Sequence, residues 1–250
     1  MEIKPQEFID FVLILLRAGI IMTLLPIFGS KNLPAQFRIG FIIALSFLLT
    51  PLIDIKVSQG DIPLIIISEV IAGLVMGIIA RSVFMVAEMA GQVMSNTMGL
   101  SMATVFDPEA GYSTEVSRLF WIITIFIFFV SGIHRDVVYI FVKSYELIPP
   151  GRLSFTGAIE DLISFGGNIL RMSLKMASGV VVIMLAINIM MGFISRSVPQ
   201  MNVFFVAYPV YIGIGLFVMF ISLPAYMYFS GASFDLMKEQ LVKSLYLMRR

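Results

Sequence analysis

Six long apolar segments dominate this sequence and restrict what it can fold into. A helix that crosses the apolar layer of a bilayer, roughly 30 Å thick, needs about 20 apolar residues. The segments that reach or approach this length are 8–28, 37–53, 62–81, 119–133, 169–194 and 203–229. The second and fourth are short, which favours tilted or re-entrant helices there. The pattern predicts an all-α membrane protein with about six long apolar helices.

The composition supports a membrane protein and argues against several classes of function. Hydrophobic residues make up 59% of the chain and charged residues 13%, whereas soluble domains contain about 25% charged residues. A net charge of +1 offers no basic surface for nucleic acid. With one histidine and no cysteine, we expect no transition-metal site, no disulfide and no cysteine nucleophile. We therefore expect neither a cofactor nor an enzyme.

Two regions indicate how the chain is organised. The apolar run after residues 1–7 is too long for the hydrophobic core of a cleavable signal peptide, so we interpret it as the first membrane-embedded helix. The stretch 145–167 contains Pro149-Pro150-Gly151 and is the most polar long connector. It predicts a boundary between a larger helical unit, 1–150, and a smaller one, 168–250.

A polar run interrupts the apolar segments between residues 87 and 111. Its polar and acidic members are Glu88, Gln92, Asn96, Asp107 and Glu109. Such side chains are costly in lipid, so they require protein partners, water or a pathway. We expect the function of the chain to reside in this run.

Two features of the polar run suggest a gate that closes a pore. Met94, Met98 and Met102 follow the spacing i, i+4, i+8 on one helix face; they suit an ordinary core equally well as a deformable seal. Pro108 disfavours helix at Asp107, which predicts that the preceding helix ends there. The turn that follows is either a plain turn or a plug. The candidate gate residues are Met94, Met98, Met102, Phe106, Asp107, Pro108, Glu109 and Gly111.

Charged residues also fall within or beside the apolar segments. They are Arg17, Glu69, Arg81, Glu88, Arg171 and Lys175. Each would cost about 2.5–3.5 kcal/mol at the centre of a bilayer. They either snorkel or form ion pairs between helices, or they line a polar path for protons or substrate. Arg17 lies near the middle of its segment, so we expect it to have a partner.

Small residues recur at helical spacing along the third apolar segment. Gly73 and Gly77 form a GxxxG pattern, and Ala87 with Gly91 extends it. Such residues let helices approach closely, so the pattern predicts packing contacts and no chemistry.

Three blocks of this sequence together resemble a known family. They run from Arg17 to Pro51, from Glu69 to Pro108 and from Ser195 to Pro209, where the sequence reads SRSVPQMNVFFVAYP. Matching positions in the first block are Arg17, Pro26, Phe28, Gly29, Pro34 and Arg38, and in the second Glu69, Gly73, Gly77, Ala87, Gly91, Gln92, Met98, Gly99, Ala103, Asp107 and Pro108. In this order and spacing they resemble the FliR family of export-gate proteins, which flagellar and virulence type III secretion systems share.

The resemblance implies an architecture and a set of partners. The chain would be a FliP-like unit fused to a FliQ-like unit, with many apparent membrane helices arranged as bent hairpins. It would join FliP-like, FliQ-like and FlhB-like membrane subunits around a pore for unfolded exported proteins. Its place would be the bacterial inner membrane, in the flagellar basal body. The turn with Arg196, Pro199, Gln200 and Asn202 would contact neighbouring subunits.

Two further functions compete with an export-gate subunit. A secondary transporter or small-solute channel also uses broken helices and polar groups at membrane depth, but the sequence has no visible inverted repeat. A purely structural scaffold for basal-body assembly fits the same features.

Overall fold

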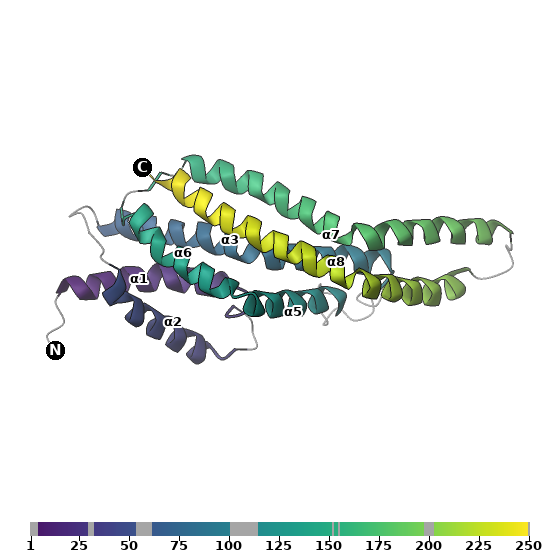
Figure 1. The fold of residues 1–250 in the computed structure, drawn as a ribbon, viewed down its shortest axis with the longest axis horizontal. Coiled ribbons are helices and arrows are strands. Elements are labelled where there is room, and N and C mark those ends of the chain that lie inside the picture. The colour runs from purple at the N-terminus through teal and green to yellow at the C-terminus, as the bar shows by residue number, and fades with distance from the viewer. Residues whose placement is uncertain are drawn as a thin grey trace. The chain divides into compact units, whose positions relative to one another are not determined.

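The computed structural model describes residues 5–29, 33–53, 62–100, 115–151, 153–154, 156–197 and 203–249. Within these ranges the regular elements are seven α-helices and one 3-10 helix (Figure 1). They are α1 (Pro5–Leu24), α2 (Ala35–Leu49), η1 (Thr50–Leu52), α3 (Ile62–Thr97), α5 (Glu115–Val130), α6 (Ile133–Leu147), α7 (Thr156–Ser197) and α8 (Val203–Met248).

The first two helices pack against each other through one apolar face of each. In α1 the buried positions Ile14, Ala18 and Ile21 recur every three or four residues, which is the helical period, and Leu13 beside them is also buried. In α2 only Ile42, Ser46 and Leu49 are buried, and large apolar side chains on its other faces are exposed. Most of α2 therefore needs an apolar environment from outside the chain.

Helix α3 is longer than the apolar segment that predicts it. Its 36 residues span about 54 Å, and it includes the polar positions Glu88, Gln92 and Asn96. It ends because Gly99 adopts φ +79°. Leu100 N–H then donates to Ser95 O at 3.1 Å, and Gly99 N–H to Asn96 O at 3.2 Å, which is a Schellman C-cap. Helix α3 therefore ends before Asp107, and the predicted helix end at Asp107 lies outside the described residues.

Helices α5 and α6 follow each other with a break of two residues. Gly132 precedes α6 with φ 73°, a left-handed conformation that interrupts the helix. The exposed positions of α5 beyond its first turn are apolar, whereas those of α6 include Arg135, Tyr139 and Lys143. The sequence pattern missed α6, because its continuous apolar run, 137–142, is only six residues long and charged residues flank it.

The last two helices are the longest. Helix α7 has 42 residues and α8 has 46, and α8 continues through Pro209 and Pro224. Each proline lacks an N–H and so removes one backbone hydrogen bond from the helix. The predicted apolar segments 169–194 and 203–229 are confirmed as helical, but the helices extend well beyond them into polar sequence.

The chain packs as two compact units that interleave along the sequence. The first comprises Met1–Val83, Phe128–Gly166 and Phe234–Arg250, and the second Phe84–Ile127 and Gly167–Ser233. The division into 1–150 and 168–250 was predicted from the connector 145–167 and from the family resemblance, and the packing units do not test it. It stays a prediction.

Four helical stretches of the described chain are long and apolar enough to cross a membrane. They are Ala35–Leu52, Ile62–Thr97, Ile159–Ser197 and Ala207–Met248, and the α5–α6 pair is a possible fifth. The chain is therefore an all-α protein suited to a membrane. The described part has seven α-helices, and the expected count of about six long apolar helices is not confirmed. Helix α1 is not among the four stretches, since acidic residues and Arg17 interrupt its apolar run.

Candidate functional site

Arg17 and Glu69 form a buried ion pair inside the first unit. Both side chains have no exposed surface. Arg17 Nε donates to Glu69 Oε2 at 2.8 Å and Arg17 Nη2 to Oε1 at 2.6 Å, so the guanidinium grips both carboxylate oxygens. This bidentate geometry is the strongest form of a charged pair between side chains. The expectation that Arg17 has a partner is confirmed.

The guanidinium of Arg17 makes three more contacts, all at the end of α6. Nη1 donates to Ser144 Oγ at 2.7 Å, and Nη2 donates to Ile148 O at 3.3 Å. The centre of the guanidinium lies 3.9 Å from the centroid of the Tyr145 ring. Tyr145 OH in turn donates to Leu13 O at 3.4 Å. The cluster therefore joins α1, α3 and the end of α6.

A glycine lets α1 and α3 come close enough for this pair. A Cβ at Gly73 would lie 3.3 Å from Arg17 O and 3.1 Å from Ile20 Cβ, and one at Gly77 would lie 2.5 Å from Leu24 Cδ1. The predicted packing role of these two glycines is confirmed. Close backbone approach is what brings the carboxylate of Glu69 within reach of a side chain one helix away.

The other charges of the apolar segments are not held in the same way. Arg81, Arg171 and Lys175 are exposed on this chain, and Glu88 is half-buried. Lys175 Nζ lies 5.1 Å from the centroid of the Phe229 ring, a cation–π distance. Arg81 and Lys175 are therefore not buried within this chain, and whether they snorkel, pair with another subunit or line a polar path stays a prediction. Water, lipid head groups or another subunit must therefore solvate the charges of Arg81 and Lys175.

The candidate gate is described only in part. Met94 and Met98 are buried in the second unit, where a Cβ at Gly215 would lie 2.6 Å from Met98 Cγ. Both methionines thus fill the packed interior of this chain. The remaining gate residues, Met102, Phe106, Asp107, Pro108, Glu109 and Gly111, lie outside the described residues. The gate stays a prediction.

The polar part of α3 contacts α5 within the second unit. A Cβ at Gly91 would lie 2.5 Å from Ser117 Cα, so the two backbones touch. Ser117 Oγ donates to Gln92 Oε1 at 3.4 Å, and Gln92 Nε2 to Asn96 Oδ1 at 3.4 Å. Part of the predicted polar run is therefore satisfied by the chain's own side chains.

Two polar clusters were missed from the sequence. Asp161 of α7, 5% exposed, accepts hydrogen bonds from three α8 side chains, Gln240 Nε2, Lys243 Nζ at 2.7 Å and Ser244 Oγ at 2.6 Å. In the second unit, the hydroxyls of Thr124 and Tyr226 lie 2.6 Å apart. Their partners are about 80 and 100 residues away in sequence, and no local pattern links them.

The expected subunit-contact turn is also only partly described. Arg196 lies exposed in the last turn of α7. Pro199, Gln200 and Asn202 lie outside the described residues. Its contact role is not tested.

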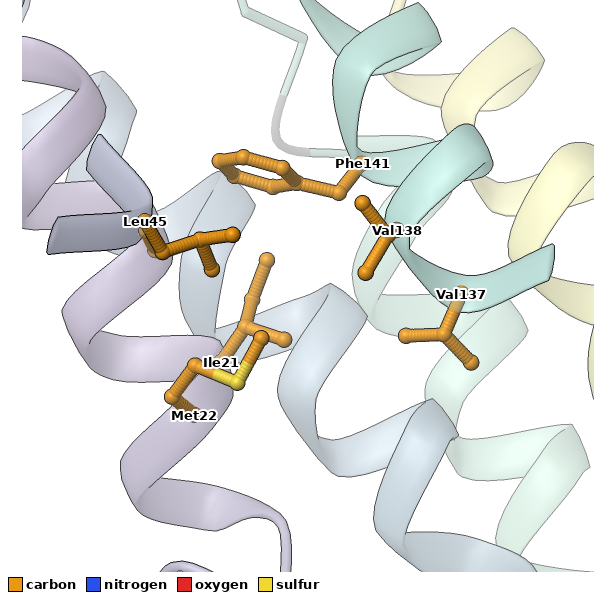
Figure 2. Close-up of a pocket in the computed structure, with 7 residues that line it drawn as sticks. Ile21, Met22, Leu45, Val137, Val138 and Phe141 are labelled. Atoms are coloured by element: carbon orange, nitrogen blue, oxygen red, sulfur yellow. The ribbon is translucent and has the colours of Figure 1, made fainter. Parts of the chain in front are cut away.

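A small apolar pocket lies between α1, α2 and α6 in the first unit. Figure 2 shows Ile21 and Met22 of α1, Leu45 of α2, and three α6 side chains around it. The full lining is Ala18, Ile21, Met22, Leu45, Val137, Val138 and Phe141. With no polar atom to orient a ligand, it offers no chemistry. Among the described residues no group of His, Cys, Asp and Glu could hold a metal ion.

Comparison with known proteins identifies the family of the chain. The family described as bacterial export proteins, family 1, matches residues 8–237. This chain belongs to that family. The match begins within α1 and ends within α8, and it includes Arg17, Glu69 and Asp161.

Individual relatives in curated collections agree with the family. The flagellar biosynthetic protein FliR of Bacillus subtilis is 29% identical over 224 residues, 84% of each chain. The FliR of Caulobacter vibrioides is 26% identical over 218 residues, 84% of this chain and 87% of its own. The surface presentation of antigens protein SpaR of Shigella flexneri is 25% identical over 252 residues, 96% of this chain and 97% of its own.

Proposed function

We propose that this chain is a membrane subunit of the flagellar type III protein export gate, through which unfolded flagellar proteins leave the cell. The observation that carries the proposal is the family match over residues 8–237, together with relatives named as flagellar biosynthetic proteins over 84% of the chain. The role is that of a channel component and not of an enzyme.

The exposed surface of the long helices supports a subunit that functions among partners. Helix α7 exposes Val182, Leu185, Met190 and Phe193, which lie along one broad side of the helix. Lipid can cover such faces, but the exposed Arg171 and Lys175 on the same helix need water or a polar neighbour. A surface of this mixed kind suits an assembly around a conduit.

We also propose specific partners and a location for this subunit. The partners are FliP-like, FliQ-like and FlhB-like membrane subunits, and the cargo consists of unfolded exported proteins. The location is the bacterial inner membrane, at the basal body of the flagellum. On this proposal, the division into 1–150 and 168–250 reflects a FliP-like and a FliQ-like unit, and the turn from Arg196 to Asn202 contacts a neighbouring subunit.

A secretion assay tests the proposed function. In a strain that lacks the gene, flagellar hook and filament proteins should be made but should not appear in the culture medium. Supplying the full chain from a plasmid should restore them. Normal secretion in the strain without the gene would contradict the proposal.

The segment 106–111, with the methionines before it, is proposed to close the pore when no cargo is present. Replacing Asp107–Gly111 by a Gly-Ser linker of equal length should raise the ion leak of cells in which export is blocked. The control is Lys143→Ala, which changes an exposed side chain of α6. An unchanged leak in the linker variant, with the assembly intact, would remove the plug role.

The alternatives make different predictions. A secondary transporter or small-solute channel should purify as a monomer or homo-oligomer and bind a solute, and the family match does not favour it. A scaffold would be needed for assembly but would leave the leak unchanged in the linker variant.

A further inference from the structure

The stretch between α6 and α7 is held at three points by other parts of the first unit. We call residues 148–154 the α6–α7 connector; Arg152 within it lies outside the described residues. Ile148 O accepts from Arg17 Nη2, Gly151 N–H donates to Ser68 Oγ at 2.9 Å, and Ser154 N–H donates to Met248 O at 3.0 Å. A stretch with prolines and a glycine would otherwise be free to adopt many conformations.

Of the three residues that bind the connector, Arg17, Ser68 and Met248, only Arg17 carries a charge. It also binds the helix that leads into the connector. Its Nη1 holds Ser144 Oγ, and Ser144 O accepts the N–H of Ile148 at 2.8 Å. One guanidinium thus binds both the last turn of α6 and the first residue of the connector. Glu69 holds the guanidinium in this orientation through both of its oxygens.

The chemistry of arginine fits this task and that of lysine does not. A guanidinium presents five N–H donors in a rigid planar fork, whereas an ammonium is a compact point charge. Here Nε, Nη1 and Nη2 serve three acceptor residues, Glu69, Ser144 and Ile148. A lysine could pair with Glu69 but could not reach all three.

Stability alone does not account for the pair. Removing two charges from water costs so much that a well-packed apolar pair of similar volume is often as stable as a buried ion pair. Such pairs instead fix one arrangement among several when each donor has a defined acceptor. The acceptors of Arg17 outside Glu69 all lie at the end of α6 and the start of the connector.

We propose that Arg17 is a positioning residue that fixes the α6–α7 connector, with Glu69 as the group that orients it. The connector leads into α7, whose Asp161 is bound to α8. Arg17 therefore fixes the position from which α7 starts. This role is independent of which proteins the gate exports.

Hydrogen exchange of the full-length protein, purified with the membrane proteins that accompany it, tests this role. In Arg17→Lys the protein should fold, and the peptide 148–154 should exchange roughly tenfold faster or more, as expected for a lost charge-assisted hydrogen bond. Peptides of α3 should keep their protection. The control is Arg81→Lys, an exposed arginine of α3, which should leave the connector unchanged.

A double variant separates positioning from stability. Arg17→Leu alone leaves Glu69 buried without its partner and should lower the thermal midpoint, whereas Arg17→Leu with Glu69→Leu should recover most of it. In the double variant the connector should still exchange fast. Wild-type exchange of residues 148–154 in the double variant, or in Arg17→Lys, would overturn the proposal.

Discussion

At the scale of single residues, glycine decides where two helices of the second unit can touch. A Cβ at Gly91 would lie 2.5 Å from Ser117 Cα and 2.9 Å from Ser117 N, and backbone atoms cannot move aside as a flexible side chain can. Gly192 of α7 has the same residue type in a helix but open space around it, with no atom within 4 Å. Alanine substitutions at Gly91 and Gly192 therefore compare a crowded helix position with an open one.

Gly91→Ala should therefore lower the stability of the purified protein by about 1–3 kcal/mol, the usual cost of overpacking. Gly192→Ala should raise it by about 0.5–1 kcal/mol, because alanine is the better helix former. The measurement is the midpoint of thermal unfolding in detergent. A Gly91→Ala midpoint equal to that of the wild type would show that α3 and α5 do not touch there.

The sequence alone could not identify the partners of Arg17. The position of Arg17 in mid-segment predicted a partner, but Glu69 lies 52 residues away and Ser144 lies 127 residues away. Nothing in one sequence pairs such positions, because only the packing of three helices brings them together. The GxxxG pattern did predict close approach, since its cause is local.

At the scale of elements, a polar clamp joins the start of α7 to the end of α8. Asp161→Ala should cost about 1–3 kcal/mol, because the buried Ser244 hydroxyl loses its acceptor. The Lys243 contribution should be small, since that side chain is 60% exposed. Thermal unfolding of the purified protein measures the effect. Glu160→Ala, one residue away and exposed, should be neutral, and an equal loss in both variants would contradict the clamp.

Helix α6 provides a second test at this scale. Its exposed Tyr139 and Lys143 are one turn apart, with Lys143 Nζ 5.0 Å from the centroid of the Tyr139 ring, whereas α5 exposes Ile122 and Phe126. We expect α6 to face water and α5 an apolar environment. Because the chain has no cysteine, single cysteines at Tyr139, Lys143 and Phe126 can be tested with a membrane-impermeant maleimide.

The cysteines at Tyr139 and Lys143 should react, and the one at Phe126 should not. Labelling at Phe126 alone would contradict this assignment and would favour α5–α6 as one membrane span.

The elements were predictable where a continuous apolar run approaches the length of a membrane span, and unpredictable where the run is short. Runs such as 37–53 and 203–229 became α2 and part of α8. Helix α6 was missed because its apolar run, 137–142, has only six residues, far fewer than a membrane span needs. Pro108 predicted a helix end at Asp107, whereas the left-handed conformation of Gly99 ends α3 at Thr97.

At the scale of the whole molecule, the described helices expose both apolar and charged side chains. Long helices expose large apolar side chains such as Phe193 and Phe217, and long helices also expose the charged side chains of Arg81, Arg171 and Lys175. Lipid alone does not suit such a surface, because charges next to lipid tails are costly. Neighbouring subunits around a water-filled conduit would cover the apolar faces and solvate the charges.

The composition of the native complex tests this claim most directly. The tagged full-length chain, extracted in mild detergent from membranes at its natural expression level, is analysed by native mass spectrometry. The account predicts a hetero-oligomer with at least two further small membrane proteins in a fixed ratio. A stable monomer or homo-oligomer without companions would contradict it.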